Sequence, residues 1–190
     1  MNGVAAIIIA SSARSALVRE QCIPAAQKAS PTELVVVADY EDSVSGVRWL
    51  CVPPLLRNTC DALIKRDIGT LATTSDWLCY VCDDHALRAV PKGLPDPRLI
   101  GVPARFCTLE THEQVLLPMG LAGENAPYCA GHAGLFHRAL VRRRPWSTMP
   151  RDRLWDVLSS RLYMEDGAHI VGPLGGFTVE DLEPVRAPWR

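Results

Sequence analysis

Four short apolar runs dominate the first half of this 190-residue chain, and none of them alternates with polar positions. Continuous runs of this kind are typical of strands in a parallel sheet that is buried on both faces. The runs are Ala5–Ala10, Leu34–Ala38, Val47–Val52 and Trp77–Cys82. Two helical segments, Leu17–Ala29 (interrupted early by Pro24) and Asn58–Thr73, lie between them. The order strand, helix, strand, strand, helix, strand predicts an α/β fold with a mostly parallel sheet flanked by helices.

Acidic residues follow two of these runs directly. Asp39 ends the second run, and Asp83, Asp84 and His85 end the fourth. Because parallel strands end at the same edge of a sheet, we expect these side chains to meet where open α/β sheets bind their ligands. Carboxylate oxygens and an imidazole suit a divalent cation. The alternative is a loop in which Asp84 caps the next helix, and this stretch alone fits both interpretations.

Composition limits the classes of function. The length fits one domain with a substantial core, and a net charge of -1 argues against nucleic-acid binding through overall charge. Arginines 138, 142, 143, 144, 151 and 153 form either a candidate basic patch or an ordinary solvated face. No apolar run approaches the ~18 residues of a membrane span. The start of the chain is interpreted as a strand and not as a signal peptide.

The seven cysteines have no framework spacing, which predicts reduced, buried thiols in a cytoplasmic protein. Cys79 and Cys82 together with Cys129 and His132 have the spacing of a zinc site. However, residues three apart on a strand point to opposite faces, so we favour buried thiols over zinc.

The second half of the chain is less regular. Proline-rich residues 88–104 predict loops, Phe106–Leu117 predicts two successive strands, and Arg153–Tyr163 predicts a helix. From Gly172 onward the chain is rich in glycine and proline, so we expect a poorly ordered tail over 172–190 after a single compact domain over 1–171.

Taken in order, short motifs along residues 4–170 resemble the family 2 glycosyltransferases and their relatives of the GT-A fold. An apolar strand leads into a small polar loop, a second strand ends in an acid, and a helix carries an Arg-Asn-x-Gly element. A metal motif, a glycine-containing loop and a Glu-Asp pair follow. Here these motifs are Ile7–Ser12, Val35–Asp39, Arg66–Gly69 with Asp67 in place of Asn, Asp83–His85, Gly131–Phe136 and Glu165–Asp166.

The resemblance implies an inverting transfer of a sugar from a nucleotide-diphosphate donor, most commonly a UDP-sugar, to an acceptor hydroxyl. It implies donor contacts from Ala10, Ser11, Ser12, Arg14, Asp39, Arg66, Asp83, Gly131 and His132. It implies Mn2+ or Mg2+ bound by Asp83, Asp84 and His85, where Asp-x-His variants of other GT-A enzymes bind manganese. Asp166 is the expected general base, and Glu165 is the alternative.

Other interpretations of the same residues stay open. A sugar nucleotidyltransferase uses a related sheet, but the loop after the first strand lacks the glycines expected there. A non-catalytic sugar-nucleotide-binding protein fits the His85 substitution and the short stretch of chain after Glu165 and Asp166. The acceptor is open as well: the compact domain suits a protein, a polysaccharide, modified DNA, or a partner subunit that completes the site.

Overall fold

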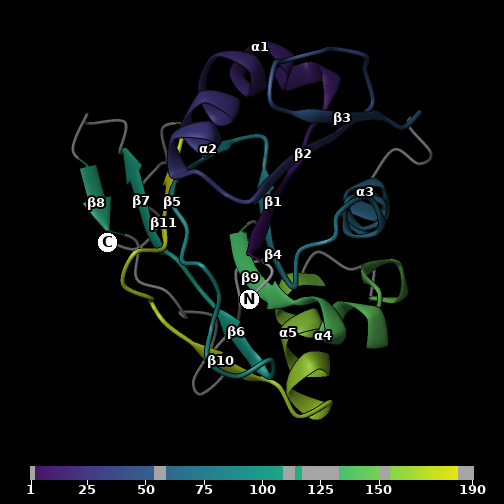
Figure 1. Ribbon diagram of the computed structural model, residues 1–190, viewed down its shortest axis with the longest axis vertical. Helices are drawn as coiled ribbons and strands as arrows, with labels where there is room; N and C mark the ends of the chain where they lie inside the picture. Colours follow the sequence, from purple (N-terminus) through teal and green to yellow (C-terminus); the bar gives the residue numbers. More distant parts are fainter. Residues whose placement is uncertain (1–2, 54–58, 109–113, 117–132, 150–154, 184–190) are drawn as a thin grey trace.

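The computed structural model describes the chain except for residues 1–2, 54–58, 109–113, 117–132, 150–154 and 184–190. The described part has an α/β fold with two β-sheets and flanking helices (Figure 1). Its strands are β1 (Val4–Ile9), β2 (Glu33–Ala38), β3 (Arg48–Cys51), β4 (Trp77–Cys82), β5 (His85–Ala89), β6 (Leu99–Gly101), β7 (Ala104–Thr108), β8 (Gln114–Leu116), β9 (Ala133–His137), β10 (His169–Val171) and β11 (Thr178–Asp181). Its α-helices are α1 (Ser15–Leu17), α2 (Ile23–Ala29), α3 (Thr59–Ala72), α4 (Arg138–Arg143) and α5 (Trp155–Glu165).

The larger sheet has the strand order β10-β6-β9-β4-β1-β2-β3 within the described residues. Strand β9 is antiparallel to β4 and β6, and the other pairs are parallel. All six residues of β1 are buried, as its continuous apolar run predicts. Because β2 and β4 flank β1 in parallel, the C-terminal ends of these three strands meet at one edge.

The smaller sheet has the order β5-β11-β7-β8 and lies beside the larger one (Figure 1). Only two residues, Asp83 and Asp84, separate β4 from β5, so the turn at these residues connects the two sheets. Strand β11 is antiparallel to β5 and parallel to β7. The edge that carries the acidic residues is therefore built from both sheets.

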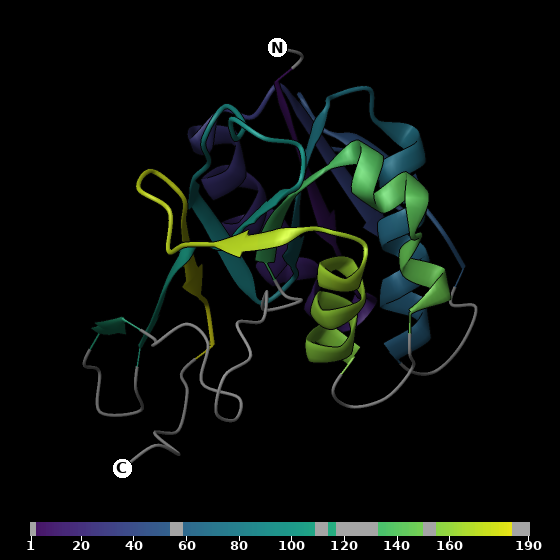
Figure 2. The same ribbon diagram turned by 90° about the horizontal axis from the view of Figure 1, so that it is seen from below.

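The two faces of the larger sheet pack into separate apolar clusters. On one face, Ala6 and Ile8 pack with Ile23 of α2. On the other, Ile7 packs with Leu63 of α3. Figure 2 shows α3, α4 and α5 together on this second side. The predicted α/β fold with a mostly parallel sheet flanked by helices is confirmed. Within the described residues, no helix is long and apolar enough to cross a bilayer.

Local sequence explains two details of the helices. A π-helical turn over Val18–Cys22 comes just before Pro24, which has no backbone N–H to continue the ladder of the preceding turn. In α3, a Cβ on Gly69 would overlap the side chain of Ile7, so glycine allows this helix to lie close against β1.

Three expectations for the second half are corrected. The glycine-containing loop Gly131–Phe136 is a strand from Ala133 onward, where Gly134 stands opposite Tyr80 of β4. Residues 172–183 are not a poorly ordered tail, because β11 pairs with β5 and β7 and buries Val179. The segment after Asp84 is a strand and not a helix, so Asp84 caps no helix there.

Candidate functional site

A short loop after β1 connects the ends of three strands. Ser11 donates two hydrogen bonds to Asp83 Oδ2, from its backbone N–H at 2.8 Å and from its hydroxyl at 2.6 Å. The backbone N–H of Ser12 donates to Asp39 Oδ1 at 2.6 Å. The loop thus binds the acid that ends β2 and the acid that follows β4 at once. This arrangement brings together Ser11, Ser12, Asp39 and Asp83, as the sequence predicts.

Lys65 of α3 lies beneath the same loop and was not predicted. Its side chain is buried, and its ammonium group donates to the carbonyl oxygen of Ala10 at 2.9 Å. It also lies 2.6 Å from a carboxylate oxygen of Asp61 and 3.9 Å from one of Asp39. The i,i+4 spacing of Asp61 and Lys65 could be found in the sequence, but the contacts with the ends of β1 and β2 depend on the fold.

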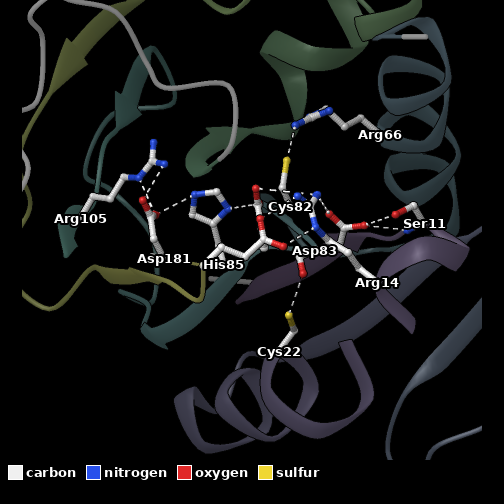
Figure 3. Close-up of polar contacts among 11 residues, drawn as sticks. Ser11, Arg14, Cys22, Arg66, Cys82, Asp83, His85, Arg105 and Asp181 are labelled. Carbon is white, nitrogen blue, oxygen red and sulfur yellow. Dashed lines mark hydrogen bonds and ion pairs between the residues drawn. The ribbon is translucent and has the colours of Figure 1, made fainter. Parts of the chain in front are cut away.

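Arg14 supplies a positive charge to the site from a side chain that is 37% exposed. Its NH1 nitrogen lies 3.1 Å from Asp83 Oδ1 and 3.9 Å from Asp84 Oδ2 (Figure 3). The other edge of the guanidinium donates to Glu183, from Nε at 3.1 Å and from NH2 at 2.9 Å. Glu183 was missed in the sequence because it lies in the segment expected to be poorly ordered.

His85 lies between two carboxylates. Its Nδ1 faces Asp84 Oδ1, and its Nε2 lies 2.9 Å from Asp181 Oδ1 (Figure 3). Burial alone would lower the pKa of His85, but Asp181 and Asp84 outweigh burial and raise this pKa to about 9. The two carboxylates therefore favour the charged form of the ring.

Arg105 of β7 completes this row across the smaller sheet. Its guanidinium donates to both oxygens of Asp181, at 2.7 and 3.0 Å (Figure 3). Burial would raise the pKa of Asp181, but the hydrogen bonds from His85 and Arg105 outweigh burial and lower it. Strand pairing alone juxtaposes these three residues, which is why no sequence motif reveals Asp181 and Arg105.

The predicted metal set is only partly supported. Among the described residues, no group of three His, Cys, Asp or Glu side chains is arranged to hold a metal ion. Both nitrogens of His85 face carboxylates in this arrangement, and its predicted role as a metal ligand stays a prediction. Asp83 and Asp84 do share one cationic nitrogen, that of Arg14. Two carboxylates completed by phosphate oxygens and water are a common set for a divalent cation, so these two residues fit one.

Arg66 was expected to reach the donor phosphates or to support the metal motif, and its place behind the sheet edge fits the second role. Its side chain is fully buried, donates to the Ala62 carbonyl at 3.2 Å and contacts Cys82 Sγ at 3.5 Å. Its guanidinium also lies 5.5 Å from the ring centre of Trp146. Arg66 therefore supports the end of β4. Its neighbour Asp67, which replaces the expected Asn, accepts hydrogen bonds from the backbone of Trp146 and Ser147 instead.

Asp166, the predicted general base, lies away from the acidic cluster and pairs with an arginine. Asp166 accepts two hydrogen bonds from Arg144, at 2.6 and 2.9 Å. This contact, together with Arg143, lowers the pKa of Asp166 despite a small opposing effect of burial. A carboxylate with a lowered pKa is a poor proton acceptor.

Strand register places this pair at the opposite edge of the sheet. Asp166 lies just before β10, whose first residue, His169, is level with Leu99 at the start of β6. Through β9, the start of β6 is level with Trp77 at the start of β4. Asp83 lies roughly 20 Å further along β4 at ~3.3 Å per residue. The assignment of Asp166 or Glu165 as base to the acid cluster is therefore corrected.

Other predicted features have simpler roles or lie outside the described residues. Gly131 and His132 fall outside them, as does part of the arginine-rich segment. Within that segment, buried Arg138 donates to the carbonyl oxygens of Ser75 and Thr70 at 2.7 and 2.6 Å, so it is structural and belongs to no surface patch. Of the cysteines that the structure describes, Cys22, Cys79 and Cys107 are buried as predicted, whereas Cys51 is exposed and Cys82 is half-buried.

A cavity of about 690 Å³ lies at the other end of the strands, bordered by Gly3, Thr32 and Thr74, which precede β1, β2 and β4. Its lining contains one charged side chain, Lys92, and none of the acidic cluster. This cavity and the acidic cluster therefore lie at opposite ends of the strands. We assign the candidate site to the cluster because ligands of open α/β sheets bind at the carboxyl ends of strands.

No family model and no curated protein matches this chain. Solved structures do match it. A crystal structure of GalNAc-T7 with UDP, GalNAc and Mn2+ superposes with a TM-score of 0.68 at 13% identity, covering 96% of this chain and 43% of that one. The mannosyltransferase PcManGT from Pyrobaculum calidifontis, in complex with GDP-Man and Mn2+, gives 0.65 at 15% identity, covering 96% and 57%.

The chain thus spans about half the length of these two structural relatives. Identities this low carry the fold and not the activity. The mixed, mostly parallel sheet with acids at the carboxyl ends of its central strands agrees with that match. By structural similarity over 96% of its length, this chain has the GT-A fold of the glycosyltransferases.

Proposed function

We propose that this chain binds a nucleotide-diphosphate sugar at the carboxyl edge of β1, β2 and β4 and transfers the sugar to an acceptor hydroxyl. One observation carries the proposal: Ser11 and Ser12 hold Asp83 and Asp39 in a single polar cluster at that edge. Buried or half-buried acids are costly to maintain as architecture, and at this position they have a ligand to serve. The two structural relatives were solved with UDP or GDP-Man and with Mn2+, which agrees with that ligand class.

Each residue of the proposed donor site has a role that follows from its position. Asp39, at the end of β2, accepts hydrogen bonds from the base or ribose of the nucleotide. Asp83 and Asp84 hold a divalent cation, which would neutralise the charge that builds on the departing diphosphate. Arg14 binds a phosphate oxygen. Lys65 fixes the Ala10 carbonyl and stays close to Asp39, so it keeps the loop and the nucleotide-binding acid in place.

A uridine nucleotide is the first candidate for the donor, and guanosine is the second. The carboxylate oxygens of Asp83 and Asp84 suit both Mg2+ and Mn2+, and His85 as a further ligand would favour Mn2+. The acceptor is proposed to be a hydroxyl group on a protein, a polysaccharide or modified DNA.

Calorimetric titration of UDP and GDP, with and without Mn2+, tests the proposal. Asp39→Asn removes a charge-assisted acceptor, so nucleotide affinity should fall about tenfold or more, because such a bond contributes about 1.5–3 kcal/mol. Asp96→Asn, in a surface pair with Arg98, is the matched control and should bind as the parent does. Equal affinity of the parent and the Asp39 variant for both nucleotides would refute this donor site.

Product analysis separates the alternatives. Slow release of free sugar from UDP-sugar with added Mn2+ is expected of a glycosyltransferase. Binding without any turnover indicates a sugar-nucleotide-binding protein. Formation of a nucleotide sugar from a nucleoside triphosphate and a sugar phosphate indicates a nucleotidyltransferase.

A further inference from the structure

The guanidinium of Arg14 lies beside the two carboxylates, Asp83 and Asp84, that would hold a divalent cation. A single nitrogen, NH1, is within 4 Å of both carboxylates, at 3.1 and 3.9 Å. The opposite edge of the same guanidinium makes a two-point contact with Glu183. Arg14 therefore contacts Glu183 on one side and the two aspartates on the other at the same time.

Four carboxylates of this cluster, those of Asp83, Asp84, Asp181 and Glu183, face three cations, Arg14, His85 and Arg105, so one negative charge is left over. Three carboxylates, those of Asp83, Asp84 and Glu183, lie within 4 Å of one guanidinium, at 3.1, 3.9 and 2.9 Å. The surplus negative charge would repel the diphosphate of a donor. A divalent cation would remove this repulsion. If Arg14 stayed at the same two carboxylates, however, the cation and the guanidinium would repel each other.

We propose that Arg14 is an internal counter-ion that competes with a divalent cation for Asp83 and Asp84, and that the cation displaces it toward the donor phosphate. The proposal rests on the proposed donor site and deepens it. The Arg14 side chain is 37% exposed, so it has room to move, whereas Asp83 is held in place by two hydrogen bonds from Ser11. Contact with Glu183 can persist while NH1 exchanges Asp83 for a phosphate oxygen.

Glu183 belongs to the segment that follows β11. The next backbone contact in this segment, from Leu182 N to the Asp84 carbonyl at 2.8 Å, fixes the segment against the turn between β4 and β5. Glu183, which binds Arg14, is therefore next to a residue that is fixed to the turn of Asp83 and Asp84. Metal binding and phosphate binding are thereby coupled through one arginine.

The test is calorimetric titration with MnCl2 alone, followed by UDP at saturating Mn2+. Arg14→Gln removes the competing charge, so Mn2+ alone should bind about tenfold tighter, a figure that allows for the solvent exposure of Arg14. The same variant loses a phosphate contact, so UDP should bind about tenfold weaker. Arg14→Lys keeps the charge and should stay within threefold of the parent in the Mn2+ titration. Arg19→Gln, which breaks an exposed pair with Asp42 instead, should match the parent in both titrations.

Opposite changes in the two affinities support the proposal, because misfolding would weaken both. Equal Mn2+ affinity of the parent and Arg14→Gln overturns it, and so does an absence of Mn2+ binding in every variant. If the parent then still binds UDP without metal, the donor site stands while the counter-ion role falls. If the parent binds no nucleotide under any condition, the proposed function itself fails, whatever the Mn2+ affinities.

Discussion

Glu33, the first residue of β2, accepts hydrogen bonds from both the backbone N–H and the hydroxyl of Ser75, at 2.7 and 2.5 Å. The same carboxylate accepts the backbone N–H of Thr74 at 3.0 Å. One side chain thus holds the segment that leads from α3 into β4. Burial would raise the pKa of Glu33, but these hydrogen bonds outweigh burial and lower it from its ordinary value of 4.5.

The stabilisation by Glu33 should depend on pH. A depressed folded-state pKa stabilises the fold above the unfolded pKa, and the stabilisation is lost as the pH falls through the folded pKa. We expect Glu33→Gln to lower the free energy of unfolding by about 1 kcal/mol at pH 7 and progressively less below about pH 4. Urea unfolding across this range measures the difference. Exposed Glu41→Gln serves as control, and a penalty for the Glu33 variant that is constant from pH 3 to 7 would contradict the assignment.

Gly69→Ala should destabilise the fold, although glycine-to-alanine changes within exposed helices usually stabilise. The added Cβ would overlap Ile7 and push α3 away from β1. We expect a loss of about 1–3 kcal/mol in chemical denaturation, the range for overpacking a core. Gly175→Ala, where nothing lies within 4 Å of the added carbon, should change stability by less than about 0.5 kcal/mol. A stabilised Gly69 variant would show that α3 does not pack this closely.

Arg138→Met should be strongly destabilising, because it leaves the Ser75 and Thr70 carbonyl oxygens and the Thr73 hydroxyl without their shared donor. The expected loss is about 2–4 kcal/mol by thermal or chemical unfolding. Arg142→Gln, an exposed neighbour from the same helix, should be nearly neutral. Equal effects of the two changes would mean that the arginines act together as a surface patch after all.

Asp166→Asn should leave UDP affinity and donor hydrolysis at the parental level. It breaks the two-point contact with Arg144, so the thermal midpoint should fall by roughly 2–4 °C. Glu165→Gln, at the exposed end of α5, should change neither the UDP affinity nor the rate of donor hydrolysis nor the thermal midpoint. A loss of turnover of 10²-fold or more in either variant, with donor binding intact, would restore a general base at this position.

The sequence predicted the parts of the fold that depend on local apolar pattern. Strand β4 begins and ends where its apolar run does, and β1 and β2 fall within a residue of theirs. The strands β6, β10 and β11 were missed because each has three or four residues, and β9 was missed because glycine and histidine conceal its pattern. Such strands are specified by the neighbours they pair with, which a single sequence does not display.

The candidate site divides in the same way. Asp39, Asp83 and the Ser11–Ser12 loop were predictable because each directly follows a recognisable strand. Asp181, Arg105 and Glu183 were not, since they reach the site through pairing of β5, β7 and β11 from distant parts of the chain. Glu165 and Asp166 were wrongly assigned because their place in the sequence matched a motif. Strand register puts them at the opposite end of the strands from Asp83.

The position of β9 between β4 and β6 has a consequence for how the chain folds during synthesis. Strands β1 to β4 emerge from the ribosome first, yet one edge of β4 has no partner until β9 has been made. At ~5–20 residues per second, the intervening stretch of about fifty residues delays that partner by roughly 3–10 s. During this interval an apolar strand edge, Trp77–Cys82, is open to pairing with other chains. Nascent chains truncated before Ala133 should therefore aggregate or recruit chaperones, whereas chains extended past His137 should not.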